Sequence, residues 1–194
     1  MKQLWLLAGA NGSGKSTFYH TQLEPLGLPF INADIIAREF FPNAPEAHSY
    51  DAAKIAEEIR QQLLFENRSF CFETVFSHPT KIDFVARAKS LGFEVILVFI
   101  HLDFVELNKA RVSQRVREGG HFVPDDKVES RVPRTLANVK ATLPLCDQAR
   151  FLDNSSAFDP FRPVATYKNG LVTYHDYPPT EWLVEMFSEV ETIN

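Results

Sequence analysis

Residues 9–16 read Gly9-Ala10-Asn11-Gly12-Ser13-Gly14-Lys15-Ser16, directly after the apolar run Leu4-Trp5-Leu6-Leu7-Ala8 and directly before Thr17. The spacing matches the pattern G-x-x-x-x-G-K-[ST] in its required context, with a short buried strand before it and a helix start after it. The glycines let the backbone turn its N–H groups inward around phosphate oxygens, and the following helix adds the positive end of its dipole. The pattern therefore predicts a phosphate-binding loop.

The last two residues of the loop predict a nucleoside triphosphate with a metal ion. At these positions Lys15 reaches the β- and γ-phosphates, and the Ser16 hydroxyl ligates Mg²⁺. We expect ATP or GTP to be bound by Gly9, Ala10, Asn11, Gly12, Ser13, Gly14, Lys15, Ser16 and Thr17. Because Lys15 serves phosphate charge rather than packing, we expect its side chain to be exposed without nucleotide. A glycine-rich turn with no ligand would not need Lys and Ser at these offsets.

Composition and charge narrow the class of partner. A chain of 194 residues with 45% hydrophobic content is close to the usual size of one domain, so we expect residues 1–194 to form one domain. The formal net charge of −5 disfavours a broad basic surface for nucleic acid. No apolar stretch approaches the roughly 20 residues that cross a bilayer, and Cys71 and Cys146 form no close metal-type pair. These features favour a cytoplasmic protein that binds a nucleotide and has no membrane contact.

Buried strand patterns alternate with helical patterns along the chain. The strand-like runs are residues 3–8, 30–32, 69–76, 93–100 and 150–155, followed by a hairpin at 164–174 around Asn169-Gly170 and a closing helix after Thr180. Runs that are apolar on both faces are typical of a parallel sheet covered by helices on each side. The sequence therefore predicts an α/β fold of three layers, α/β/α, with a central and mainly parallel sheet and a C-terminal hairpin plus helix.

Two carboxylates follow predicted strands and should lie near the phosphate loop. Asp34 comes after the run 30–32, and Glu73 stands near the end of the run 69–76. The carboxyl ends of parallel strands share one edge, where ligands bind in such sheets. Asp34 there is suited to accept a proton from a hydroxyl, but it is equally suited to cap the next helix or to support Mg²⁺. Glu73 has the alternative of being an ion-pair partner of Lys15.

A basic segment at about 104–140 predicts a lid. Two helical stretches flank the loop Gly119-Gly120-His121. They carry Arg111, Arg115, Arg117, Arg131 and Arg134. Guanidinium groups bind phosphate oxygens in bidentate fashion and stay charged, which suits a mobile segment that closes over a polyphosphate. The alternative is a solvated basic face, and we expect two or three of the five arginines to act on phosphate.

The ordered set of motifs resembles the zeta-toxin family of P-loop kinases, in the compact bacterial branch often described as predicted ATPases. It comprises residues 9–17, Asn32-Ala33-Asp34, Phe72-Glu73-Thr74, residues 119–124 and Leu152-Asp153-Asn154-Ser155. The resemblance covers nearly the whole chain. It implies an ATP-dependent kinase that phosphorylates a hydroxyl of UDP-N-acetylglucosamine and that an antitoxin protein can block.

The resemblance also implies roles for individual residues. Asp34 matches the catalytic aspartate of the family, and Glu73 with Thr74 and His121 falls on the substrate side. Asn154 falls on the nucleotide side together with Arg115. The catalytic arginines match among Arg115, Arg117 and Arg131, and we assign phosphoryl transfer to Arg117 and Arg131 with Lys15. This chain is shorter than the toxins that define the family.

Two other functions use the same loop. One is a module that hydrolyses ATP to switch between binding partners, but the chain has no L-S-G-G-Q signature and its arginine-rich segment suits closure over an acceptor. The other is a polynucleotide 5′-hydroxyl kinase, which the acidic balance disfavours because such an enzyme needs a basic groove. A small-molecule hydroxyl is therefore the expected acceptor.

Overall fold

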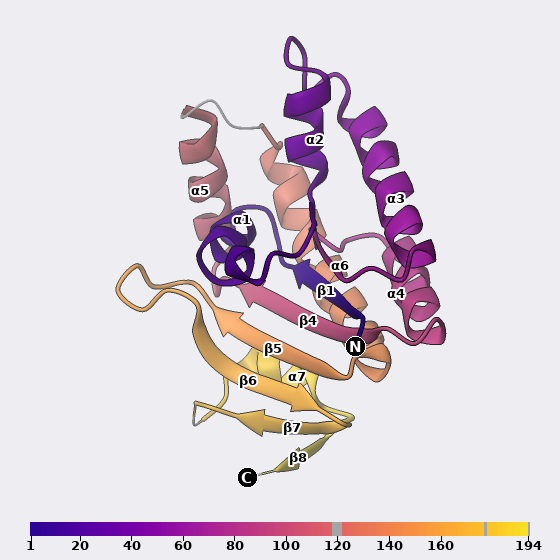
Figure 1. The fold of residues 1–194 in the computed structure, drawn as a ribbon. Coiled ribbons are helices and arrows are strands. Elements are labelled where there is room, and N and C mark those ends of the chain that lie inside the picture. Colours follow the sequence, from indigo (N-terminus) through magenta and orange to yellow (C-terminus); the bar gives the residue numbers. More distant parts are fainter. Residues whose placement is uncertain (118–121, 177, 194) are drawn as a thin grey trace.

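The computed structural model describes residues 1–117, 122–176 and 178–193, and the described chain is built on an eight-stranded sheet (Figure 1). The strands are β1 (Gln3–Ala8), β2 (Phe30–Ile31), β3 (Phe70–Thr74), β4 (Glu94–His101), β5 (Gln148–Asp153), β6 (Arg162–Lys168), β7 (Leu171–Tyr174) and β8 (Glu191–Ile193). Their order across the sheet is β2-β3-β1-β4-β5-β6-β7-β8.

The sheet is mixed and mainly parallel, as predicted. The strands from β2 to β5 pair in parallel, β5, β6 and β7 pair antiparallel, and β8 pairs in parallel with β7. The predicted hairpin is present between β6 and β7. Asn169 and Gly170 both have positive φ at its turn, which the Asn-Gly pair favours.

The helices are α1 (Lys15–Phe18), α2 (Ala33–Phe40), α3 (Ser49–Phe65), α4 (Thr80–Ser90), α5 (Val105–Arg117), α6 (Asp125–Thr142) and α7 (Glu181–Met186). A π-helical turn (Tyr19–Leu23) and a 3₁₀ turn (Glu24–Leu26) continue α1, and a second 3₁₀ turn (Leu143–Leu145) continues α6. These helices lie on both faces of the sheet, which confirms the three-layer α/β/α prediction.

The alternating side chains of β1 show how the layers form. Leu4 and Leu6 face the core that α3, α4, α6 and α7 cover, while Trp5 and Leu7 face the core under residues 15–23. All four side chains are buried. Because both faces of β1 are covered, its sequence is a continuous apolar run rather than an alternating one.

Helices α5 and α6 correspond to the predicted lid. Val112 of α5 packs with Val123 and Val128 in a small apolar cluster of their own. This cluster joins the two helices beside the carboxyl edge of the sheet. The loop Gly119-Gly120-His121 lies outside the described residues, and closure of this segment over a ligand stays a prediction.

The strand register places the candidate site at one edge. Ala8, the last residue of β1, is paired with Thr74 at the end of β3 and with Phe99 near the end of β4. The loop that follows Ala8 therefore emerges beside the residues that follow Thr74 and His101. This edge is where open α/β sheets bind their ligands.

Candidate active site

Close backbone approaches shape the phosphate loop. Gly9 (φ 154°) lies so near β4 that an added Cβ would be 2.4 Å from the carbonyl oxygen of Ile100. Gly14 (φ 99°) has the same relation to the Nδ2 atom of Asn154, also at 2.4 Å. That amide donates a hydrogen bond to the Ser13 carbonyl oxygen at 2.8 Å. Only glycine tolerates these positions, and the loop is thereby held against the ends of β4 and β5.

Lys15 is buried, which corrects the expectation that its side chain is exposed. Its relative exposure is 6%, and its Nζ atom donates a hydrogen bond to the Ala10 carbonyl oxygen at 3.0 Å. Burial lowers the pKa of the ammonium group, while the nearby carboxylates of Glu73 and Asp34 oppose that shift. The expectation failed because the Ala10 carbonyl oxygen and the Glu73 carboxylate contact the ammonium group at the positions that phosphate oxygens were expected to take.

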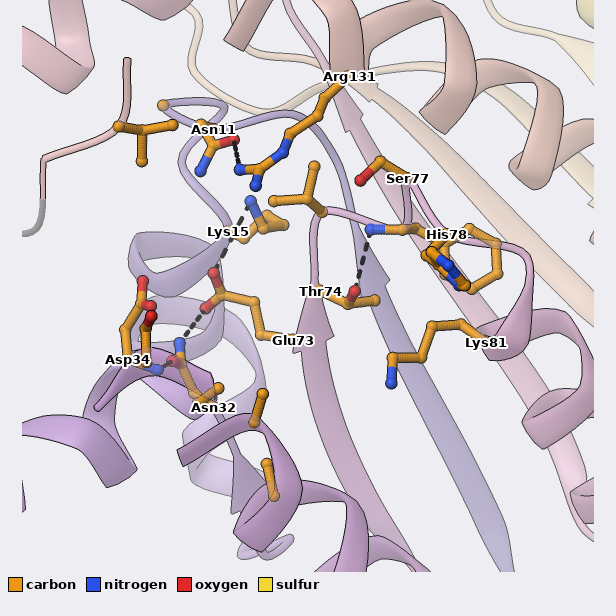
Figure 2. Close-up of a pocket in the computed structure, with 18 of the residues that line it drawn as sticks. Asn11, Lys15, Asn32, Asp34, Glu73, Thr74, Ser77, His78, Lys81 and Arg131 are labelled. Atoms are coloured by element: carbon orange, nitrogen blue, oxygen red, sulfur yellow. Dashed lines mark hydrogen bonds and ion pairs between the residues drawn. The ribbon is translucent and has the colours of Figure 1, made fainter. Parts of the chain in front are cut away.

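Glu73 connects three parts of the site. Its Oε2 atom accepts hydrogen bonds from the Ser16 hydroxyl and from Asn32 Nδ2, each at 2.8 Å. Its Oε1 atom lies 3.8 Å from Lys15 Nζ. Figure 2 shows this carboxylate between Lys15 and Asn32. The ion-pair alternative for Glu73 is thus present in the structure, and it does not exclude a contact with substrate.

The oxygen atoms beside the loop fit a magnesium ion. Mg²⁺ prefers oxygen ligands and usually takes only one or two from the protein, with phosphates and water completing its shell. The Ser16 hydroxyl and the Glu73 carboxylate supply two such oxygen ligands side by side, since Ser16 Oγ lies 2.8 Å from Glu73 Oε2. No cluster of three His, Cys, Asp or Glu residues suited to a metal occurs within the described ranges. A metal held mainly by the nucleotide agrees with that pattern.

Asn32, and not Asp34, caps helix α2. The Oδ1 atom of Asn32 accepts hydrogen bonds from the backbone N–H groups of Asp34 (2.7 Å) and Ile35 (3.2 Å). Asp34 therefore stands in the first turn with its side chain exposed, and the alternative that it serves as the cap is wrong. The extended backbone of Asn32 at the end of β2 makes it the better-placed cap.

Two of the five arginines bind groups around the loop. Arg131 of α6 donates from Nη1 to the Asn11 Oδ1 atom at 3.2 Å. Arg111 of α5 donates from Nη2 to the Asn154 carbonyl oxygen at 2.9 Å. Both guanidinium groups are thus held at the edges of the phosphate loop before any phosphate is bound.

The other three arginines differ in position. Arg115 lines the hollows on both sides of Lys15. Arg117 is exposed at the end of α5, outside the described lining of either hollow, so its role in phosphoryl transfer stays a prediction. Arg134 is exposed and donates to the Ser130 carbonyl oxygen of its own helix at 3.0 Å. Arg111, Arg115 and Arg131 thus lie nearest the loop and the hollows, and which of the five arginines act on phosphate stays a prediction.

Two hollows meet at Lys15. The first hollow, of about 370 Å³, is bordered by the start of α2, by α3, by residues 73–78 and by α6 (Figure 2). The second hollow, of about 340 Å³, is bordered by residues 14–17, Arg111, Asn154 and Phe161. Both are within the usual range for small-molecule sites. Their common wall is formed by Gly12, Lys15, Glu73 and Arg115.

The two remaining candidate residues have different outcomes. Thr74 lines the first hollow, and its hydroxyl accepts a hydrogen bond from the Phe76 N–H group at 3.0 Å. Phe76 is buried with φ 62°, so the loop after β3 is bent sharply and the Thr74 hydroxyl supports the bend. His121 lies outside the described residues, and its assignment to the substrate side stays a prediction.

Three residues of the site escaped the sequence reasoning. Asn108 of α5 is 2% exposed and donates from Nδ2 to the Asn11 carbonyl oxygen at 2.7 Å. Arg60 of α3 and Lys81 of α4 line the first hollow. A signal existed for Arg60, because it stands four residues after Ala56 in the buried series 52, 56, 60 and 64.

Comparison with known proteins defines the family. A family model described as an AAA domain matches residues 4–141, and the chain belongs to this family of P-loop kinases. A relative called an uncharacterized protein, from Haemophilus influenzae, is 33% identical over 137 residues, which are 67% of this chain and 97% of the relative.

No helix of the described chain combines the length and apolar character needed to pass through a membrane.

Solved structures share the fold at low sequence identity. A chain of the AvrRxo1-ORF1:-ORF2 complex solved with ATP superposes with a TM-score of 0.71 at 17% identity, over 99% of this chain and 64% of that one. A chain from the PezAT toxin–antitoxin system of Streptococcus pneumoniae has a TM-score of 0.60 at 15% identity, over 78% of this chain and 67% of that one. The chain thus spans about 64% of the length of the first of these structures.

Proposed function

We propose that the protein is an ATP-dependent phosphotransferase that moves the γ-phosphoryl group to a hydroxyl of a small molecule. One observation carries the proposal: two ligand-sized hollows lie on either side of Lys15 and share Glu73 and Arg115 as a common wall. A kinase needs a donor site and an acceptor site that meet at the transferred group. A module that only hydrolyses ATP needs the donor site alone.

The second hollow suits the donor nucleotide. It contains the end of the phosphate loop with Ser16 and Thr17, and it continues to Asn154 and Phe161. The loop N–H groups and the start of α1 bind the phosphates, and the Phe161 ring offers an apolar surface for a base. ATP is the proposed nucleotide, and the related fold solved with ATP supports it. The loop chemistry also accommodates GTP.

Three cationic side chains stabilise the phosphoryl group as it moves. Lys15 exchanges the Ala10 carbonyl and Glu73 for phosphate oxygens, and Arg115 lies on the common wall. Arg131 is tethered to Asn11 at the opening of the loop. Fixed positive groups of this kind stabilise the charge of the transition state. Mg²⁺ bound with the nucleotide would be held by Ser16, with Glu73 beside it, and supplies further charge neutralisation.

Asp34 is the proposed base for the acceptor. Its carboxylate lines the first hollow and is close enough to Lys15 to influence that residue's pKa. In the proposed reaction the acceptor oxygen bonds to the γ-phosphorus while its proton passes to Asp34, and the bond to the β–γ bridging oxygen breaks to release ADP. Glu73 and Thr74 border the place where the acceptor hydroxyl would lie.

The acceptor we propose is a nucleotide-linked sugar such as UDP-N-acetylglucosamine. The resemblance to zeta toxins supports it, and the fold shared with a chain of the PezAT toxin–antitoxin system is consistent with it. The same resemblance suggests an antitoxin protein as a partner. The acceptor proposal and the antitoxin proposal are more specific than the kinase proposal. Either of them can be wrong while the kinase proposal still holds.

The kinase proposal is tested by the release of ADP. Purified protein is incubated with ATP and Mg²⁺, alone and with a panel of hydroxyl compounds that includes sugar nucleotides, and ADP is measured by a coupled assay. We expect release to depend on one class of added acceptor, with the variant Lys15→Met as the inactive control. Release that is the same with and without every acceptor would instead support the hydrolytic switch.

A further inference from the structure

Arg60 is a buried cation in the wall of the first hollow. Its side chain is 5% exposed, and its Nε atom has no hydrogen-bond partner in the described structure. The guanidinium carbon lies 5.2 Å from the centre of the Phe72 ring and 5.6 Å from that of Phe84. The side chain is therefore held between two aromatic rings of the core, while its position also lines a ligand-sized hollow.

The rings and one carboxylate do not satisfy this charge. Burial lowers the pKa of Arg60, and Glu57, one turn earlier on α3, only partly opposes that effect. Cation–π contacts recover part of the lost hydration, but they give the N–H groups no acceptor. Buried guanidinium groups in folded proteins are normally paired with acceptors. A ligand in the hollow that Arg60 lines could supply an acceptor to the terminal N–H groups of this guanidinium, whereas its Nε atom is fully buried.

A second cation lies beside the first. Lys81, in the first turn of α4, lines the same hollow. Its pKa is lowered first by burial and next by the charge of Arg60, while the carboxylate of Glu57 partly opposes these effects at Lys81 as it does at Arg60. Among the described residues, no hydrogen bond or ion pair satisfies the Lys81 ammonium group. Two like charges brought together at the wall of a hollow are stabilised when an anion lies between them.

The first hollow as a whole is lined by more positive than negative side chains. Its lining contains five cationic side chains, Lys15, Arg60, Lys81, Arg115 and Arg131, and two carboxylates, Asp34 and Glu73. This excess stands against a formal net charge of −5 for the chain. Figure 2 shows Lys81 and His78 on one side of β3, with Lys15 and Asp34 on the other. Arg60 and Lys81 line the first hollow alone, whereas Lys15 and Arg115 also line the second.

We propose that Arg60 and Lys81 form an anion-binding subsite that holds a phosphate or carboxylate group of the acceptor. The proposal rests on the kinase function and specifies its acceptor as an anionic compound, with its anionic group at Arg60 and its reacting hydroxyl at Asp34. Neutral alcohols leave Arg60 without a partner and are poor acceptors. This subsite makes no contact with the donor nucleotide, since Arg60 and Lys81 do not line the second hollow.

The subsite is tested directly with inorganic phosphate as the probe. A non-hydrolysable ATP analogue first saturates the phosphate loop, and phosphate binding is then followed by ³¹P NMR line broadening. The variants are Arg60→Met, which keeps an unbranched side chain between the rings, and Lys81→Gln, at a half-buried position whose replacement spares the core. Lys54→Gln is the matched control, because it removes one charge from the exposed face of α3. Circular dichroism and binding of the analogue establish that each variant is folded.

We expect both subsite variants to bind phosphate about tenfold more weakly or worse, and the control to match the wild type. Equal binding by all four proteins would overturn the proposal, as would no binding by the wild type. In the transfer assay the variants should raise the acceptor KM and leave the KM for ATP unchanged. If the protein transfers phosphate to neutral alcohols and Arg60→Met does not change that rate, the subsite proposal is wrong and the kinase proposal stands. If phosphate binding depends on Arg60 but no hydroxyl compound is phosphorylated, the kinase proposal is wrong and the anion-binding site stands.

Discussion

The Nζ atom of Lys15 lies 3.8 Å from the Oε1 atom of Glu73, and both side chains are largely buried, at 6% and 12% exposure. The same carboxylate also accepts hydrogen bonds from Ser16 and Asn32. Lys15 therefore has to leave an existing partner to contact a phosphate, whereas Glu73 retains two hydrogen bonds when it does so. The ion pair links the donor and acceptor sides of the proposed kinase.

Replacing Lys15 by Met should abolish phosphoryl transfer without unfolding the protein. Removal of one fixed cation at a developing charge lowers a rate by at least roughly 10²-fold. The fold should persist because Ser16 and Asn32 still satisfy Glu73 and because Met fills the buried space. Transfer is measured with labelled ATP, and folding is measured by circular dichroism and urea unfolding. Transfer at the wild-type rate would remove the loop from the mechanism.

Asp34→Asn should lower kcat strongly and leave the KM for ATP nearly unchanged. The amide cannot take a proton, while helix α2 keeps its cap because the cap is Asn32. Stability is therefore expected to change by only about 0.5 kcal/mol, as for an exposed substitution. Steady-state kinetics and urea unfolding measure the two effects. A variant with wild-type kcat would show that Asp34 is not the base.

Arg131→Lys should cost far more activity than Arg134→Lys. Arg131 contacts the phosphate loop at Asn11, and a lysine cannot reproduce its planar, bidentate binding of phosphate. We expect a loss of roughly 10²-fold or more in kcat for a transition-state arginine. Arg134 bonds to its own helix, so it is the matched control on α6. The same change at Arg117 tests its predicted role. Full activity in all three variants would reduce the basic cluster to a solvated face.

The stability of the unliganded protein should depend on His101 in mildly acidic solution. Burial lowers the pKa of this imidazole to about 4, against the opposing charge of Asp153. The unfolded chain therefore binds the proton more tightly, and stability is lost as the pH falls from about 6.5 towards 4. At about pH 5 the loss is roughly 2 kcal/mol. Urea unfolding of the wild type and His101→Gln at about pH 7 and pH 5 measures it. The same decrease in both proteins would rule out His101 as the source.

The sequence predicted the sheet and the phosphate loop because both depend on local patterns. The run at residues 4–8 is buried on both faces, and the glycines after it fit approaches that exclude a side chain. The nearness of Glu73 to the loop was also predictable, since parallel strands share their carboxyl edge. In each case residues close in sequence, or one rule of topology, decided the outcome.

The features that escaped prediction depend on contacts between distant segments. Lys15 is buried because Glu73, more than fifty residues later, and a loop carbonyl surround its ammonium group. Asn32 rather than Asp34 caps α2 because β2 ends at Ile31 and the helix already begins at Ala33. Arg60 stands at a position where the helical period of α3 places apolar residues. The sequence alone does not show that its side chain lies against the Phe72 ring or that it lines the first hollow.

The destination of the γ-phosphoryl group is the most direct test of the kinase proposal. Protein, Mg²⁺ and γ-labelled ATP are incubated with a mixture of phosphorylated and neutral hydroxyl compounds, and the labelled products are separated and identified by mass spectrometry. The proposed function predicts a labelled phosphoester on one class of hydroxyl compound, formed by the wild type and absent with Lys15→Met. Label found only in inorganic phosphate, whatever compound is added, would contradict it.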